Sequence, residues 1–292
     1  MSAPAVSVVV PCYNGGRFLD QLLKSLRAQK FRDFEVVIVD DGSSEPDTIA
    51  RLAALPPDIR VVRQANAGLP AARNTGFRNA QGSFVLPLDC DDALEPSYLS
   101  TLVSALQVAP SDVGFVFTHM RLVGAITGTF KTRFDRFDQL FVNRLPYCML
   151  LRKSAWEAVG GYDETMRDGS EDWEFSIRLA QAKFRGIEIA LPLFIYMVRA
   201  DGMLLSKTAR LQGTMWRNIR MRHKALYRPS ALVKCWREVN GQWRSALSAF
   251  TMLVLSRLLS EPRYNALCFR FIGFARGWRV MRGHLTLPAG TA

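Results

Sequence analysis

Apolar residues in the first two thirds of this 292-residue chain fall into short continuous runs and into runs at helical spacing. Short apolar runs bounded by turn residues are typical of buried strands, and an i, i+3, i+4 spacing is typical of amphipathic helices. These patterns predict strands at residues 5–10, 35–39, 60–63, 84–88 and 113–120, the first of them ended by Pro11, which cannot donate to a strand ladder. They predict helices at residues 18–29, 69–80, 96–108 and 154–159, and a further helix that begins at Ser170.

Strands and helices alternate along this part of the chain, and the strands are apolar throughout rather than at every second residue. Strands of that kind are covered on both faces, which is typical of parallel sheets. The pattern therefore predicts an α/β fold with a doubly wound, mostly parallel sheet. The stretch 127–145 is rich in Phe and Arg without a regular period, and it is predicted to be a loop.

Candidate ligand-binding residues follow three of the predicted strands at the point where each strand ends. They are Pro11, Tyr13 and Asn14 after the first strand, Asp40 and Asp41 after the second, and Asp89, Asp91 and Asp92 after the fourth. Because parallel strands share one polarity, these residues are expected at one edge of the sheet, where open α/β folds bind ligands.

The three acids of the 89–92 stretch can be interpreted either as a metal site or as part of a helix cap. Two carboxylates about 4 Å apart repel by roughly 4 kcal/mol at an effective dielectric near 20. A hard divalent cation held by one or two carboxylates and by substrate phosphates would offset this repulsion. Alternatively, Asp92 caps the following helix and the other acids lie solvated beside the helix dipole. The stretch by itself leaves both interpretations open.

Glu171 and Asp172 occupy the first two positions of the helix that Ser170 is predicted to cap. Free backbone N–H groups at a helix start favour the ionised form of a carboxylate, and an ionised carboxylate there can act as a general base. The alternative is that both acids only offset the helix dipole.

The net charge of +12 is concentrated in the last third of the chain. Residues 1–206 carry 22 Lys and Arg against 24 Asp and Glu, a net charge of −2, whereas residues 207–292 carry 16 against 2, a net charge of +14. This last part contains a basic amphipathic segment near residues 211–219, an apolar run at 246–259, and a predicted amphipathic helix at 264–278 with arginines on its polar face. Such helices fit an anionic membrane surface, and the alternative is a helical cap packed on the sheet. No nucleic-acid-binding module is recognisable.

The five cysteines are scattered, with no CxxC pair, which predicts reduced thiols in a cytosolic compartment rather than a disulfide framework or a zinc site. The N-terminus has no basic region before its apolar run, so no signal peptide is expected. No stretch reaches the ~18 apolar residues that span a bilayer.

Five motifs occur in an order and spacing that resemble those of the inverting family 2 glycosyltransferases. They are VSVVVPCYN at 6–14, VIVDDGS at 37–43, NAGLPAARNTG at 66–76, LDCDD at 88–92, and GGYD at 160–163 followed by EDW at 171–173. The resemblance covers about residues 5–206 and implies a GT-A fold. It implies a nucleotide-sugar-binding half at 1–110 and an acceptor-binding half with the catalytic base at 111–206. The charge and hydrophobic pattern add a basic amphipathic helical extension at 207–292.

The resemblance also implies roles for single residues. Tyr13 would flank the nucleotide base beside Pro11 and Asn14, Asp41 with Asp40 would bind base or ribose, and Arg73 would hold the nucleotide-sugar. Asp89 and Asp91 would be the DxD pair that contacts the donor and a Mn²⁺ or Mg²⁺ ion. Asp172 would be the catalytic base, with Glu171 supporting it or binding acceptor.

Many relatives carry a histidine near the end of the domain, used at the metal or diphosphate, whereas this chain has Tyr196-Met-Val-Arg199 there. The last protein ligand of the metal is therefore open, and Arg199 is a candidate to meet the diphosphate. The resemblance implies transfer from a UDP- or dTDP-sugar to a glycan or lipid-linked acceptor, by a peripheral enzyme on the cytoplasmic face of the membrane. The alternatives are a nucleotidyltransferase, which needs a Gly-rich basic phosphate loop that is poorly represented after residue 11, and a non-enzymatic membrane-surface adaptor.

Overall fold

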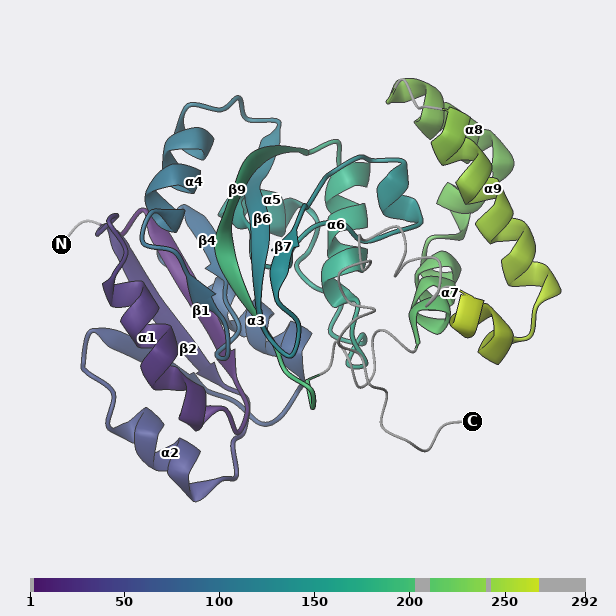
Figure 1. Cartoon of the computed structure of the whole chain (residues 1–292). Helices are drawn as coiled ribbons and strands as arrows, with labels where there is room; N and C mark the ends of the chain where they lie inside the picture. Colours follow the sequence, from purple (N-terminus) through teal and green to yellow (C-terminus); the bar gives the residue numbers. More distant parts are fainter. Residues whose placement is uncertain (1–2, 203–210, 240–242, 268–292) are drawn as a thin grey trace. The chain divides into compact units, whose positions relative to one another are not determined.

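The structure is a computed structural model that describes residues 3–202, 211–239 and 243–267. The chain divides into two compact units. The first contains Met1–Met120 and Lys131–Met197, and the second contains Arg121–Phe130 and Val198–Ala292. The first unit is a mixed sheet with helices on both faces (Figure 1).

The strands that the structure describes form one sheet in the order β3-β2-β1-β4-β8-β6-β9-β5, with β7 paired to β6. Their bounds are β1 Val6–Cys12, β2 Phe34–Asp40, β3 Ile59–Arg63, β4 Phe84–Pro87, β5 Ala93–Leu94, β6 Val113–Gly124, β7 Gly128–Phe130, β8 Leu150–Arg152 and β9 Arg185–Val198. Strands β1 to β4 are parallel, and β8 then pairs antiparallel with both β4 and β6. The apolar runs predicted this α/β architecture and its parallel strands, and the antiparallel pairs of β8 make the sheet mixed.

The helices of the first unit connect these strands. They are α1 Leu19–Arg27, α2 Pro46–Ala53, α3 Leu69–Asn79, α4 Tyr98–Gln107, α5 Lys153–Ala158 and α6 Glu171–Gln181, with short 3-10 turns at Gly16–Phe18 and Asp138–Leu140. The predicted helices at 18–29, 69–80, 96–108 and 154–159 are confirmed to within two residues at each end.

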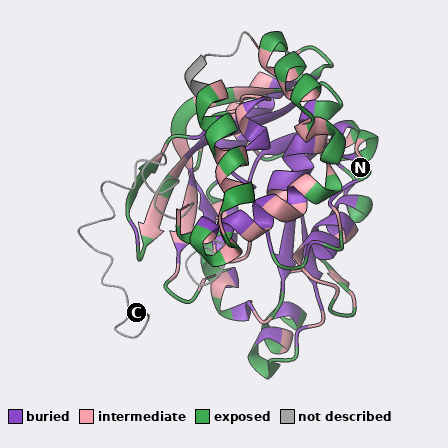
Figure 2. Ribbon diagram, turned by 90° about the vertical axis from the view of Figure 1, so that its right-hand side faces the viewer, coloured by how far each residue is buried: buried purple, intermediate pink, exposed green. Residues whose placement is uncertain are grey.

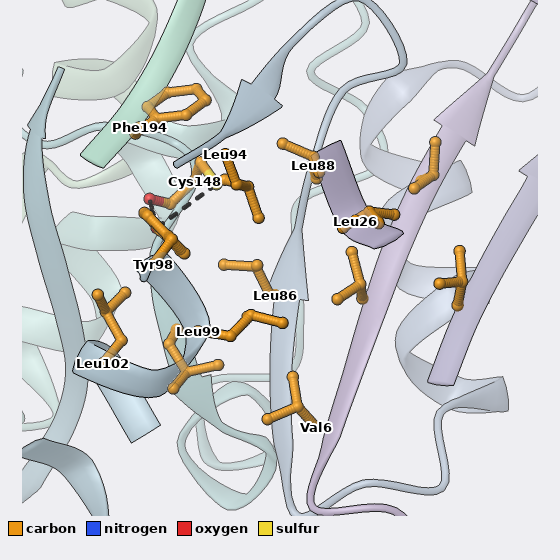
Figure 3. Packing of buried hydrophobic residues seen from close by; sticks show 14 of the residues in the cluster. Val6, Leu26, Leu86, Leu88, Leu94, Tyr98, Leu99, Leu102, Cys148 and Phe194 are labelled. Atoms are coloured by element: carbon orange, nitrogen blue, oxygen red, sulfur yellow. Dashed lines mark hydrogen bonds between the residues drawn. The ribbon is translucent and has the colours of Figure 1, made fainter. Parts of the chain in front are cut away.

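Strand β1 is buried along its whole length, and Figure 2 shows buried strands with helices whose outer sides are exposed. Val8 packs in a cluster with leucines of α1 and α4, whereas its neighbour Val9 packs in a second cluster with residues of α3 and α6. Figure 3 shows the first cluster, in which Leu86 of β4 lies near Leu99 of α4. Burial of a side chain of this size contributes about 1.5–3 kcal/mol to stability. The helices on both faces of the sheet therefore stabilise the strands whose ends carry the candidate site residues.

The prediction that Pro11 ends the first strand is wrong. Strand β1 continues to Cys12, with Pro11 opposite Val39 of β2. The carbonyl of Cys12 accepts from the amide of Asp41, on the side of β2, so Pro11 faces the side of β4. The last registered pair on that side is Val9 with Pro87, and a proline there leaves no ladder hydrogen bond unmade.

Several elements were not anticipated. They are α2, the short strands β5 and β8, and the long strand β9. The predicted loop at 127–145 is only partly correct, because it includes β7 and the 3-10 turn at Asp138–Leu140.

The second unit contains α7 Gln212–Arg222, α8 Pro229–Glu238 and α9 Trp243–Leu258. Trp216 of α7 is buried and stacks on Tyr264, with ring centres 5.9 Å apart. The run at 246–259 is helix α9, which exposes Leu247, Phe250 and Leu258. The predicted amphipathic helix at 264–278 lies mostly outside the described residues. Of the helices that the structure describes, none has the length and hydropathy needed to cross a bilayer.

Candidate active site

The loops after β1 and β2 are tied together by the side chain of Asn14. Its Oδ1 accepts hydrogen bonds from the backbone amides of Ser44 at 2.9 Å and Glu45 at 3.0 Å. Asn14 has a φ of 51°, in the left-handed region that asparagine tolerates better than most residues. Its neighbour Tyr13 leaves 54% of its surface exposed, so its ring is accessible at the carboxyl end of the sheet.

Asp40 and Asp41 are both buried and both hydrogen-bonded to nearby backbone. Asp40 accepts from the amide of Ser43, and Asp41 accepts from the amides of Ala67 at 2.8 Å and Gly68 at 2.9 Å. Gly68 has a φ of 92°, which an L side chain rarely adopts, and it precedes α3. Asp41 therefore holds the loop that leads into α3, and with it the start of the helix that carries Arg73.

Arg73 joins two acidic segments that are far apart in the sequence. Its guanidinium donates to Oε1 of Glu171 at 2.6 Å and to both carboxylate oxygens of Asp89, at 2.9 and 3.2 Å. Only 1% of Arg73 is exposed, and its guanidinium carbon lies 4.8 Å from the ring centre of Tyr147 and 5.6 Å from that of Tyr162. Two aromatic rings and two carboxylates thus fix this cation at the end of the sheet.

Glu171 and Asp172 begin α6 after Ser170, which has a φ of 65° and makes no side-chain cap hydrogen bond. Oδ2 of Asp172 accepts from Nδ2 of Asn143 at 3.0 Å. Burial raises the pKa of Glu171 from 4.5 to about 7, and burial likewise raises the pKa of Asp172. The expectation that the helix start keeps both acids readily ionised is therefore wrong, because loss of water outweighs the backbone dipoles and the single charge of Arg73.

The interpretation of Asp92 as a helix cap is also wrong. Helix α4 begins only at Tyr98, after Ser97, and Asp92 is 2% exposed. Its Oδ1 accepts from the amide of Met197 at 2.7 Å, and its Oδ2 accepts a short hydrogen bond from the hydroxyl of Tyr147. Burial raises the pKa of Asp92 well above its ordinary value.

Asp89 and Asp91 are the acids of this turn that remain partly exposed. Asp89 keeps lone pairs beyond those that accept from Arg73, since a carboxylate has about four acceptor positions. Among the residues that the structure describes, no group of three or more His, Cys, Asp and Glu side chains is arranged to hold a metal ion. Two carboxylates are nevertheless the donor set that a hard cation uses when substrate phosphates supply the other oxygens.

Arg199 and the cysteines are the remaining residues that the sequence singled out. Arg199 lies in the second unit, where it pairs with Asp201 at 2.5 Å. Cys12, Cys90, Cys148 and Cys235 are free thiols, and Cys268 lies outside the described residues.

Three residues near the acids were missed in the sequence. Asn143 and Tyr147 lie in or next to a stretch without regular period, so no local pattern marked them. Tyr162 lies in the GGYD motif but was given no role. Sequence reasoning had named Arg73, Asp89, Glu171 and Asp172, and the structure brings these four together.

The sequence of the chain is similar to that of known glycosyltransferases. The model of the family "Glycosyl transferase family 2" matches residues 7–159. The uncharacterized glycosyltransferase alr2836 of Nostoc sp. is 40% identical over 121 residues, which cover 40% of this chain and 37% of that protein. Glycosyltransferase GlyA of Streptococcus pneumoniae is 34% identical over 110 residues, which cover 37% of this chain and 16% of that protein. The chain thus spans well under two thirds of these relatives.

Solved structures share the fold over most of the chain. S. aureus TarS 1-349 in complex with UDP-GlcNAc has a TM-score of 0.59 at 18% identity, covering 93% of this chain and 92% of that one. The mannosyltransferase PcManGT from Pyrobaculum calidifontis, in complex with GDP-Man and Mn²⁺, has a TM-score of 0.57 at 19% identity, covering 98% and 86%. The fold is therefore of the GT-A type, as the motifs implied. Because the family model matches more than half of the residues of this chain, the chain belongs to glycosyl transferase family 2.

Proposed function

We propose that the chain is a metal-dependent inverting glycosyltransferase that moves a sugar from a nucleotide-sugar donor to an acceptor hydroxyl. The observation that carries the proposal is the buried link from Asp89 through Arg73 to Glu171. It connects the strand-end acids that would meet the donor to the helix start that would supply the base. A sugar bound between these two groups would have its leaving group and its attacking acceptor on opposite sides.

The donor side is assigned to the strand-end loops. The exposed ring of Tyr13 would flank the base, next to Pro11 and Asn14, and Asp40 and Asp41 would contribute to binding of base or ribose. Support comes from the fold relatives, whose structures hold UDP-GlcNAc or GDP-Man. A UDP- or dTDP-sugar remains the donor class we propose.

Asp89 and Asp91 would hold a Mn²⁺ or Mg²⁺ ion that arrives with the diphosphate of the donor. The partial exposure of both carboxylates and the absence of a complete ligand cluster in the described residues suit an ion that draws its remaining ligands from phosphate and water. Held by Asp89 and Asp91, such an ion would supply positive charge to the departing nucleoside diphosphate. One fold relative is described with Mn²⁺.

Asp172 would act as the general base. It would accept the proton of the acceptor hydroxyl while that oxygen bonds to the anomeric carbon and the bond from this carbon to the diphosphate breaks. A single base on the side opposite the leaving group gives inversion. Burial raises the pKa of Asp172, which makes its carboxylate a stronger base than an exposed aspartate. Asn143 donates to Asp172 Oδ2 and would orient it, and Glu171 would support the base or bind acceptor.

The acceptor is proposed to be a glycan or lipid-linked sugar at the cytoplasmic face of a membrane, where the second unit would contact anionic lipid. The support is the net charge of +14 over residues 207–292 and the exposed apolar residues Leu247, Phe250 and Leu258 of α9. Phe250→Glu should reduce sedimentation with anionic vesicles, whereas the exposed Val108→Glu in the first unit should not. Equal sedimentation of both variants and the unaltered protein would contradict the membrane contact.

The transferase proposal is tested by incubating the protein with a panel of nucleotide-sugars and Mn²⁺ and measuring thermal stabilisation. A ligand that binds the native state raises the melting temperature, by an amount set by its concentration relative to Kd. The stabilising donor is then tested for transfer and for the anomeric configuration of the product. Stabilisation by nucleoside triphosphates alone, with release of pyrophosphate, would instead support a nucleotidyltransferase. No response to any nucleotide would support the non-enzymatic adaptor.

A further inference from the structure

Tyr147 lies between two acids of the 89–92 turn. Its hydroxyl oxygen accepts a hydrogen bond from the backbone amide of Asp89 at 3.0 Å, and its hydroxyl proton goes to Oδ2 of Asp92. Oδ1 of Asp92 is occupied by the amide of Met197 near the end of β9, at 2.7 Å. The backbone amide of Asp92 donates a hydrogen bond to the carbonyl of Asp89 at 3.1 Å, which closes the turn.

The ring of Tyr147 makes a second connection to the same turn. The guanidinium of Arg73 lies over this ring at 4.8 Å from its centre, and Arg73 also donates to the carboxylate of Asp89. Asp89 is therefore held at its backbone by the hydroxyl of Tyr147 and at its side chain by the cation that rests on the same ring. The rings of Phe194 and Tyr196 in turn make T-shaped contacts with the ring of Tyr147.

Asp92 differs from the other acids of the turn in its burial and in the hydrogen bonds of its carboxylate oxygens. Both of its carboxylate oxygens already accept hydrogen bonds, and the residue is 2% exposed. Asp89 and Asp91 remain partly exposed. Asp92 thus connects the turn to Tyr147 and to the end of β9, whereas Asp89 and Asp91 are the acids of the turn with exposed surface.

We propose that Tyr147 and Asp92 form a positioning pair that fixes the turn so that the carboxylates of Asp89 and Asp91 can bind a divalent metal together with a nucleoside diphosphate. The inference rests on the proposed function, because it assigns the pair a task in binding the donor. Groups that orient metal-binding side chains from behind change metal affinity or activity by about 10–100-fold when removed. A pair that served stability alone would not change metal affinity.

The experiment compares Tyr147→Phe with Tyr98→Phe, which removes another buried tyrosine hydroxyl. The hydroxyl of Tyr98 donates to the carbonyl of Cys148 at 2.9 Å and does not bond to the 89–92 turn (Figure 3). Calorimetry measures the Kd of UDP and of GDP for each variant, with Mn²⁺ and with EDTA. Tyr147→Phe should weaken Mn²⁺-dependent binding about 10–100-fold and leave binding in EDTA unchanged. Tyr98→Phe should lower the melting temperature without changing either affinity.

Asp92→Asn tests the same pair of residues if Tyr147→Phe fails to fold. A side-chain amide oxygen cannot replace both carboxylate acceptors, so this variant should also weaken Mn²⁺-dependent binding. Both changes break the hydrogen bond between Tyr147 and Asp92, so the loss of Mn²⁺-dependent affinity in the double variant should be smaller than the sum of the two single losses. Unchanged Mn²⁺-dependent affinity in these variants, or an equal loss in Tyr98→Phe, overturns the inference. Failure of the unaltered protein to bind any nucleoside diphosphate with Mn²⁺ overturns the proposed function itself.

Discussion

Arg73 donates a 2.6 Å hydrogen bond to Glu171 across 98 positions of sequence, and both side chains are almost entirely buried. The same guanidinium also binds Asp89. Removing a buried cation from its partners leaves buried charge uncompensated, which costs about 3–5 kcal/mol. Arg73→Ala should therefore lower the free energy of unfolding by about this amount, measured by chemical denaturation, and should abolish sugar transfer.

The control for this change is Arg78→Ala. Arg78 lies on the same helix and pairs with Glu164 at 2.7 Å, but the two side chains are 56% and 45% exposed. An exposed pair contributes about 0–1 kcal/mol, so the loss should be small. Similar losses in both variants would show that Arg73 has no special part in holding the two acids.

Asp172→Asn should reduce turnover by about 10²–10⁴-fold, the usual contribution of a general base. The affinity for nucleoside diphosphate should stay unchanged, because the strand-end residues assigned to the donor are intact. Glu174→Gln alters another acid in the first turn of α6, one that pairs with Arg178, and it should retain most of the turnover. Normal turnover by Asp172→Asn would show that the proton goes elsewhere.

The stability of the protein should depend on the protonation of Glu171. Burial raises the pKa of Glu171 from 4.5 to about 7 in the folded state, so the folded state binds the proton more tightly than the unfolded state. The stabilisation that comes from protonated Glu171 is then fully present below pH 4.5 and is lost as the pH rises through about 7. Glu171→Gln should become more stable relative to the unaltered protein over this range.

This comparison is made by thermal unfolding at a series of pH values. Glu157→Gln replaces an exposed carboxylate on α5, and it should follow the unaltered protein throughout. A constant difference between Glu171→Gln and the unaltered protein from pH 4 to 8 would contradict the raised pKa.

The parallel half of the sheet was predictable because its strands are buried on both faces. The run ending at Val10 has no polar interruption except Ser7, so its type and approximate position follow from hydrophobicity, although the strand continues to Cys12. Strand β8 has only three residues, so it does not stand out from a loop. Strand β9 contains an apolar stretch at 189–198 that includes Pro192, and most of its residues are half-buried or exposed. Pairing with β6 and β4 specifies these strands, and such tertiary contacts leave no local pattern.

The acids of the site were recognisable from their places after strands and at a helix start, but their environment was not. Position at a helix start suggested that Glu171 and Asp172 ionise readily, whereas their burial depends on the chain packed around α6. Tyr147 was missed for the same reason, since nothing local marks a tyrosine whose hydroxyl meets Asp92. Desolvation and long-range hydrogen bonds are properties of the fold, and residue spacing does not report them.

Asp91→Ala should remove the metal-dependent part of nucleoside diphosphate binding. The Kd of UDP in Mn²⁺ should rise to the value that the unaltered protein shows in EDTA, because one of the two carboxylates proposed to hold the ion is lost. Calorimetry in Mn²⁺ and in EDTA measures both values. An unchanged affinity in Mn²⁺ would exclude Asp91 as a metal ligand.

Tyr162→Phe should stabilise the protein, in contrast to Tyr98→Phe. The hydroxyl of Tyr162 is buried and has no hydrogen-bond partner among the residues that the structure describes, while its ring stacks on Phe175 with centres 4.4 Å apart. A buried polar group without a partner costs about 1–3 kcal/mol, so its removal should raise the free energy of unfolding by about 1 kcal/mol. Tyr98 donates to the carbonyl of Cys148, so loss of that hydroxyl should lower the free energy of unfolding by about 1 kcal/mol. Chemical denaturation of both variants measures the two changes, and a loss of stability in Tyr162→Phe would show that this hydroxyl is hydrogen-bonded in solution.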